Sequence, residues 1–91
     1  MAIQIILKGH VQGVCCRAYC KQYATKLQIR GSATNLKDGN VRVILQTDDP
    51  ERIERFIQCL KSNPYGYSFW GDIVEIEKSD YSGSIRGDYT F

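Results

Sequence analysis

This chain of 91 residues has no long apolar run and no large excess of charge of one sign. No stretch reaches membrane-spanning length, and the amino end lacks the charged segment and apolar core of a secretory signal. We therefore expect a soluble, cytoplasmic protein without a membrane contact. Twelve basic and ten acidic residues give a net charge of +2, spread along the chain, so a small anion is a better candidate partner than a nucleic acid. The length predicts one domain over residues 1–91, and we expect a monomer.

Side chains that bind metal ions are few. His10 is the only histidine, and the cysteines lack the paired Cys-x2-Cys spacing of a zinc site. We expect neither a metal nor a cofactor. The four cysteines are expected to be free thiols that pack as small apolar side chains: Cys15, Cys16, Cys20 and Cys59. A disulfide between Cys20 and Cys59 is the alternative.

Apolar periodicity and turn residues divide the chain into strands and helices. Asp38-Gly39 predicts a hairpin turn, and Asp49 followed by Pro50 predicts the start of a helix. The expected order is a strand at 3–7, a helix at 18–27, a strand before the hairpin, a strand at 41–46, a helix from Pro50, a strand at 70–76 and an edge strand within 85–91. This order predicts an α+β fold, the ferredoxin-like split β-α-β sandwich (βαββαβ), with a mainly antiparallel sheet and two helices on one face.

The most informative segment is Gly-His-Val-Gln-Gly-Val-Cys-Cys-Arg at residues 9–17, between the first strand and the first helix. Gly9 and Gly13 allow the backbone to curl until its amide hydrogens point inward. Arg17 adds a forked, permanently charged donor at the start of the helix. A cation there opposes the helix dipole, so its presence indicates an anion beside it. The segment therefore predicts a binding site for an oxyanion, above all a phosphate.

Two motifs together resemble those of the acylphosphatases, small enzymes that hydrolyse the carboxyl-phosphate bond. The family's loop, Gly-x-Val-Gln-Gly-Val-x-aromatic-Arg, stands at residues 9–17, with Cys16 at the aromatic position. Its second signature is glycine, an aromatic residue, an apolar or small residue, often a basic residue, and asparagine. That signature stands at residues 31–35, with Ser32 and Thr34 at the aromatic and basic positions. The resemblance covers nearly the whole chain.

This resemblance implies roles for individual residues. Arg17 would bind the substrate phosphate and Asn35 would position the attacking water, without a metal ion. The phosphate-binding loop would comprise His10, Val11, Gln12, Gly13, Val14, Cys15, Cys16 and Arg17. The implied function is hydrolysis of small acyl phosphates to a carboxylate and inorganic phosphate. The alternative, suggested by the three departures from the motifs, is a degenerate domain that binds an anion or a protein partner with little or no turnover.

Simpler structural interpretations stand beside these roles. Arg17 is alternatively a solvated residue at a helix start, and Asn35 a turn residue before the hairpin. The aromatic cluster comprises Tyr65, Tyr67, Phe69 and Trp70. It fits a cap on the sheet edge or core better than a surface for stacked bases, because the strands expected at 3–7 and 41–46 carry no aromatic residue.

Overall fold

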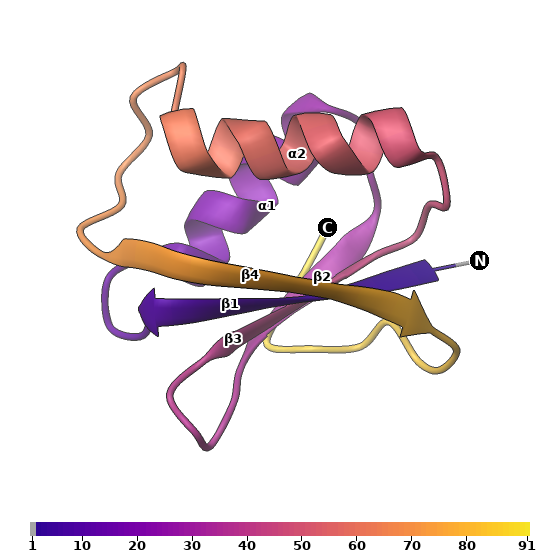
Figure 1. Cartoon of the computed structure of the whole chain (residues 1–91), viewed down its shortest axis with the longest axis horizontal. Coiled ribbons are helices and arrows are strands. Elements are labelled where there is room, and N and C mark those ends of the chain that lie inside the picture. Colours follow the sequence, from indigo (N-terminus) through magenta and orange to yellow (C-terminus); the bar gives the residue numbers. More distant parts are fainter. Residues whose placement is uncertain (1) are drawn as a thin grey trace.

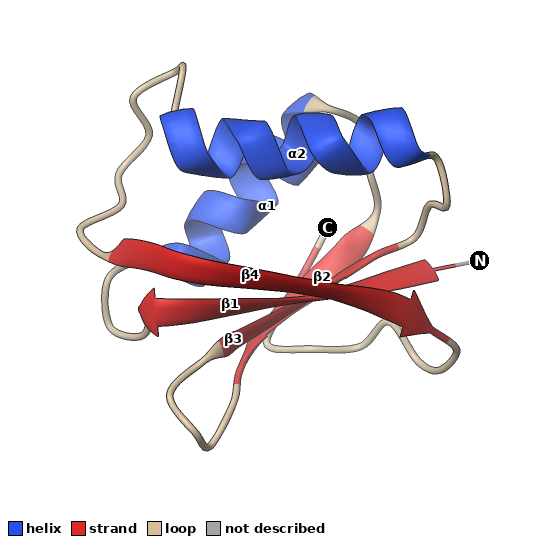
Figure 2. Ribbon diagram, in the orientation of Figure 1, coloured by secondary structure: helices blue, strands red, loops and turns tan. Residues whose placement is uncertain are grey.

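Two helices cover one face of a five-stranded sheet in the computed structural model, which describes residues 2–91 (Figure 1, Figure 2). The elements are β1 (Ala2–His10), α1 (Cys16–Lys26), β2 (Gly31–Asn35), β3 (Val41–Leu45), α2 (Pro50–Ser62), β4 (Asp72–Tyr81) and β5 (Tyr89–Thr90). The strands lie in the order β4-β1-β3-β2-β5, and each pair of neighbours is antiparallel. The predicted ferredoxin-like α+β fold is confirmed.

The core lies between the two helices and the central strands β1 and β3. Ile5 and Leu7 of β1 are buried there beside Val41, Val43 and Leu45 of β3, because alternate residues of a strand face the same side. From the helices, α1 buries Cys16, Tyr19, Cys20, Tyr23 and Ala24, and α2 buries Ile53, Phe56, Ile57 and Leu60. Both sets recur every three or four residues, as expected for a helix with one face in the core.

Several element boundaries differ from those expected. The first strand continues to His10, because Gly9 and His10 pair with Ile73 and Asp72 of β4 beyond a β-bulge. The first helix begins at Cys16, two residues earlier than the apolar periodicity indicated. The fourth strand starts at Asp72 and extends to Tyr81. It is an edge strand of the sheet, and polar residues replace the apolar alternation in its second half.

The chain after β4 crosses the face of the sheet opposite the helices. Residues 82–88 pass beneath the sheet in the view of Figure 1, and β5 then pairs with β2. Ile44, which points to this face, is buried. Gly31 and Phe91 exchange two backbone hydrogen bonds of 2.9 Å, which fix the carboxyl end beside β2. This crossing brings Asp88 and Tyr89 to the edge of the strand that carries Asn35.

Candidate active site

The loop between β1 and α1 has the curled backbone that the sequence predicts. Gly13 and Cys15 have positive φ angles of 74° and 67°, and such left-handed residues can turn successive amide groups toward one side. Cys15 is the N-cap of α1 and its side chain makes no capping hydrogen bond. The first hydrogen bond of the helix runs from Tyr19 N–H to the Cys15 carbonyl at 2.9 Å. The preceding amides at the positive end of α1 therefore lack acceptors within the helix, an arrangement that favours an anion.

A cavity of about 250 Å³ opens beside this loop. It is lined by Val11, Gly13, Cys15, Cys16, Arg17, Ala18, Asn35 and Tyr89. The structure thus brings together Arg17 of α1 and Asn35 of β2, the two predicted catalytic residues, with four of the predicted loop residues. Ala18 and Tyr89 are additions that the sequence did not indicate.

Three predicted loop residues do not line the cavity and have other contacts. His10 is exposed at the end of β1. The side chain of Gln12 donates to the carbonyls of Leu36 and Asn40, at 2.6 and 2.9 Å, and so fastens the loop to the hairpin between β2 and β3. Val14 is buried, and its carbonyl accepts a hydrogen bond of 3.2 Å from Trp70 N–H. These contacts support the shape of the loop, while binding of phosphate by the backbone amides of these residues stays a prediction.

Arg17 has an anionic neighbour within the protein. Its Nη1 lies 3.0 Å from Oδ2 of Asp88, and its Cζ lies 5.0 Å from the centre of the Tyr89 ring. A guanidinium over an aromatic face is attracted by the ring as well as by the carboxylate. Asp88 therefore compensates part of the unfavourable charge that Arg17 brings to the positive end of α1. The alternative of a merely solvated arginine does not describe this environment.

Asn35 belongs to a strand and is not a turn residue. It is the last residue of β2 and pairs with Val41, and its backbone N–H donates to Asp88 Oδ2 at 3.0 Å. The side-chain oxygen Oδ1 is buried and has no hydrogen-bond partner within residues 2–91. Asn35 is one of the residues that line the cavity, and this oxygen is not committed to another group there.

Comparison with known proteins shows the family of this chain. The family model described as Acylphosphatase matches residues 3–89. The chain belongs to the acylphosphatase family. An acylphosphatase of Caldanaerobacter subterraneus subsp. tengcongensis is 42% identical over 86 residues, which cover 92% of this chain and 90% of that protein.

Two further relatives extend the comparison. An acylphosphatase of Methanocella arvoryzae is 33% identical over 84 residues, which cover 90% of this chain and 93% of that protein. The crystal structure of acylphosphatase from Bacillus subtilis has a TM-score of 0.74 at 26% identity, and the match covers 99% of this chain and 93% of that one. The predicted acylphosphatase, a hydrolase, is thus confirmed.

The structure shows where the three residues that depart from the acylphosphatase motifs lie. Cys16 is buried in the core beneath the loop. Ser32 and Thr34 point to the sheet face opposite that of Ala33 and Asn35, where a Cβ at Gly87 would lie 2.2 Å from Thr34 Oγ1. The chain crossing that face therefore leaves no room for a large side chain at position 32. Neither Ser32 nor Thr34 lines the cavity.

The cysteines are all free thiols. Cys16 and Cys20 lie on one face of α1, and both are buried. A hydrogen bond with Cys16, together with burial, raises the pKa of Cys20. The alternative of a disulfide between Cys20 and Cys59 does not describe this structure.

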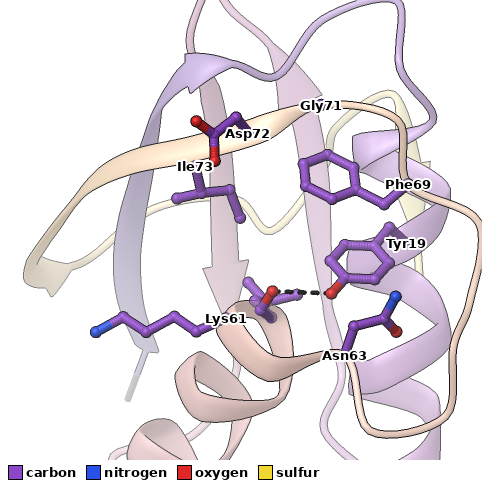
Figure 3. A pocket seen from close by; sticks show the side chains of 8 residues that line it. Tyr19, Lys61, Asn63, Phe69, Gly71, Asp72 and Ile73 are labelled. Carbon is purple, nitrogen blue, oxygen red and sulfur yellow. Dashed lines mark hydrogen bonds between the residues drawn. The ribbon is translucent and has the colours of Figure 1, made fainter.

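A second cavity, of about 340 Å³, lies between the end of α2 and the start of β4 (Figure 3). The Tyr19 hydroxyl there donates to the Leu60 carbonyl at 2.8 Å, and burial raises the pKa of this hydroxyl. The charged side chains of Lys61 and Asp72 point away from each other in Figure 3. Because this cavity lacks the curled loop and an arginine, the site beside α1 is the better candidate for acyl phosphate hydrolysis.

Of the aromatic cluster predicted from residues 65–70, Phe69 and Tyr67 pack against α1, and Phe69 lines this second cavity. Phe69 stacks on Tyr19 with ring centres 4.6 Å apart, and Tyr67 packs edge-on against Tyr23. Trp70 is exposed.

In residues 2–91 no group of three histidine, cysteine or acidic side chains is suited to a metal ion. Within the same range, no helix has the length and apolar character needed to cross a bilayer.

Proposed function

We propose that the cavity beside α1 is the active site of this acylphosphatase, in which the loop amides and Arg17 bind the phosphoryl group and Asn35 positions the attacking water. One observation carries the proposal. Segments far apart in the chain, the loop with the first turn of α1 and the end of β2, meet around one cavity of about 250 Å³. Their side chains and amides are of the kinds that this hydrolysis requires.

The bond to be broken makes limited demands on the protein. An acyl phosphate is already activated, and its leaving group is a stable carboxylate, so neither a covalent nucleophile nor a strong acid is needed. In the transition state, negative charge spreads over the non-bridging phosphoryl oxygens. Amides fixed by the left-handed residues Gly13 and Cys15, together with the Arg17 guanidinium, provide donors that need no reorganisation during the reaction.

Asn35 suits the attacking water for two reasons. Asn35 lines the cavity, and its buried Oδ1 has no hydrogen-bond partner within residues 2–91, so the carboxamide is free to turn toward a water molecule in the cavity. A carboxamide both accepts and donates hydrogen bonds, and it brings no negative charge toward an anionic substrate. An aspartate at this position would repel the phosphoryl group.

Hydrolysis of benzoyl phosphate by purified variants tests the proposed roles. Arg17→Ala should lower the rate by about 100- to 1,000-fold, because removal of one such donor has an effect of that size. Asn35→Ala should also lower the rate, while a phosphate monoester should be a poor substrate for all three proteins. Activity should persist in a chelator, since we propose a hydrolysis without a metal ion. Thermal unfolding of each variant controls for loss of fold, and Arg17→Ala with the wild-type rate would contradict the proposal.

The degenerate-domain alternative would show phosphate binding without turnover in the same assay. Of the three departures that suggest it, Ser32 and Thr34 face away from the cavity, whereas Cys16 lines it. A single acylphosphatase domain over residues 1–91, a monomeric state, a cytoplasmic location and the lack of a nucleic-acid partner stay predictions.

A further inference from the structure

We propose that Asp88 is a positioning residue, whose carboxylate holds the Arg17 guanidinium and the end of the strand that carries Asn35 in one fixed arrangement. This inference rests on the roles proposed above for Arg17 and Asn35. No motif in the sequence marks Asp88, and it does not line the cavity. Its effect on hydrolysis would therefore pass through the two residues that do.

One oxygen atom of Asp88 joins the two predicted catalytic residues. Oδ2 accepts a hydrogen bond of 3.0 Å from Arg17 Nη1 and another of 3.0 Å from the backbone N–H of Asn35. The Tyr89 ring, 5.0 Å from Arg17 Cζ, lies against the guanidinium as well. Arginine has five N–H donors in a rigid plane, so one contact through Nη1 fixes its orientation and leaves donors for a phosphoryl group.

The backbone around Asp88 is itself held against β2. The N–H of Asp88 donates to Thr34 Oγ1 at 3.2 Å, and Tyr89 pairs with Ala33. A side chain at Gly87 would force these neighbours to shift, since a Cβ there would lie 2.2 Å from Thr34 Oγ1 and 3.0 Å from Ser32 Cβ. The carboxylate is thus placed by residues on both sides of it. Thr34, which departs from the family signature, supplies one of these contacts.

The charge of Asp88 indicates that it does not serve phosphate affinity. A carboxylate close to an anion site opposes binding of a second anion. The ion pair also adds little to the stability of the fold. The side chains of Arg17 and Asp88 are 33% and 41% exposed, and ion pairs this exposed contribute little to the free energy of unfolding. Orientation of Arg17 is the effect that remains. Loss of Asp88 should therefore lower kcat without weakening phosphate binding.

A set of variants separates the position of this side chain from its charge. Asp88→Ala removes the acceptor and should lower kcat by about 10-fold or more, because small displacements of catalytic groups have effects of this size. Asp88→Asn keeps an oxygen acceptor, so kcat should stay within about threefold of wild type, while the inhibition constant for inorganic phosphate should fall as the repelling charge is lost. Gly87→Ala displaces the carboxylate without altering it and should resemble Asp88→Ala.

The control is the ion pair between Lys8 and Glu77, at 3.1 Å with side chains 36% and 53% exposed. Glu77→Gln removes a surface charge of similar exposure outside the site and should leave kcat and the inhibition constant unchanged. In an Arg17→Ala background, Asp88→Ala should lower kcat by a smaller factor than in the wild type, because the contact with Arg17 is already lost and only the hydrogen bond from the Asn35 N–H remains to be removed.

Two outcomes would overturn the inference. They are an Asp88→Ala variant with the wild-type kcat, and an Asp88→Asn variant as slow as Asp88→Ala. If Arg17→Ala itself keeps the wild-type rate, the proposed site fails together with this inference. A large loss in Arg17→Ala and none in Asp88→Ala overturns the inference alone.

Discussion

The two helices lie on the same face of the sheet but begin in opposite ways. The amino end of α2 is capped by Asp49, whose Oδ1 accepts the Glu51 N–H at 3.0 Å, and it has Pro50 at its start and Glu51 in its first turn. The amino end of α1 has a left-handed cysteine without a capping hydrogen bond, and Arg17 where α2 has an acid. The positive end of α2 is thus neutralised by its own residues. That of α1 has no capping side chain, and the nearest carboxylate described there is that of Asp88, in contact with Arg17.

The buried faces of the helices differ too. That of α2 consists of Ile53, Phe56, Ile57 and Leu60, none of which can ionise. That of α1 includes two tyrosines and two cysteines. Burial raises the pKa of both Tyr19 and Tyr23, and the hydrogen bond with Cys16 and burial raise that of Cys20. The stability that α1 provides should therefore depend on pH in the alkaline range. The buried residues of α2 contribute apolar contacts that do not depend on pH.

The largest expected effect comes from giving α1 an acid like that of α2. Cys15→Asp places a carboxylate on a residue that lines the cavity, and its repulsion of the phosphoryl group should lower kcat/KM by about 100-fold. Cys15→Asn is the matched control, because asparagine has the same shape without the charge and tolerates the left-handed conformation. Hydrolysis of benzoyl phosphate is the measurement. Equal rates for the two variants would show that the amino end of α1 does not bind the substrate.

An intermediate effect should appear at alkaline pH. In the folded protein the Cys20 thiol has a raised pKa and stays neutral, while in the unfolded chain it ionises around its ordinary value of 9.0. The stabilisation is therefore complete below pH 9 and is lost as the pH rises toward the folded-state pKa, by up to about 1.4 kcal/mol per pH unit.

Urea denaturation between pH 8 and 10 measures this loss. Cys20→Ala should flatten the dependence of the free energy of unfolding on pH. Ile57→Val in α2 serves as the control, because it lowers stability by about 1 kcal/mol without removing an ionisable group. If the slopes of Cys20→Ala and wild type coincide, the Cys20 thiol does not account for the pH dependence.

The same contrast explains how much of the protein is predictable from sequence. The α2 start follows from adjacent residues, Asp49 and Pro50, and the loop before α1 follows from its glycines and Arg17. These are local signals, and the family resemblance added Asn35, which the sheet then brings to the same cavity as Arg17. The fold and the candidate residues that meet at this cavity were therefore within reach of the sequence.

Contacts set by the tertiary structure were not within its reach. Asp88 lies 71 residues after Arg17, and nothing near it in sequence indicates that the chain crosses the sheet to reach β2. The sequence does not mark the bounds of β2, because Gly31, Ser32 and Ala33 are all buried and the usual alternation is absent. The helices cover one of its faces and the crossing segment covers the other.

The smallest expected effect returns to the start of α2. Asp49→Ala removes the acceptor of the Glu51 N–H, which should lower the free energy of unfolding by about 1 kcal/mol and Tm by roughly 4–8 °C. Asp49→Ser restores a capping oxygen and should recover most of this stability. Activity at a temperature where the variants stay folded should equal that of wild type, because this cap lies outside the site. A loss of activity in folded Asp49→Ala would show that the two helix starts do not divide stability and catalysis in this way.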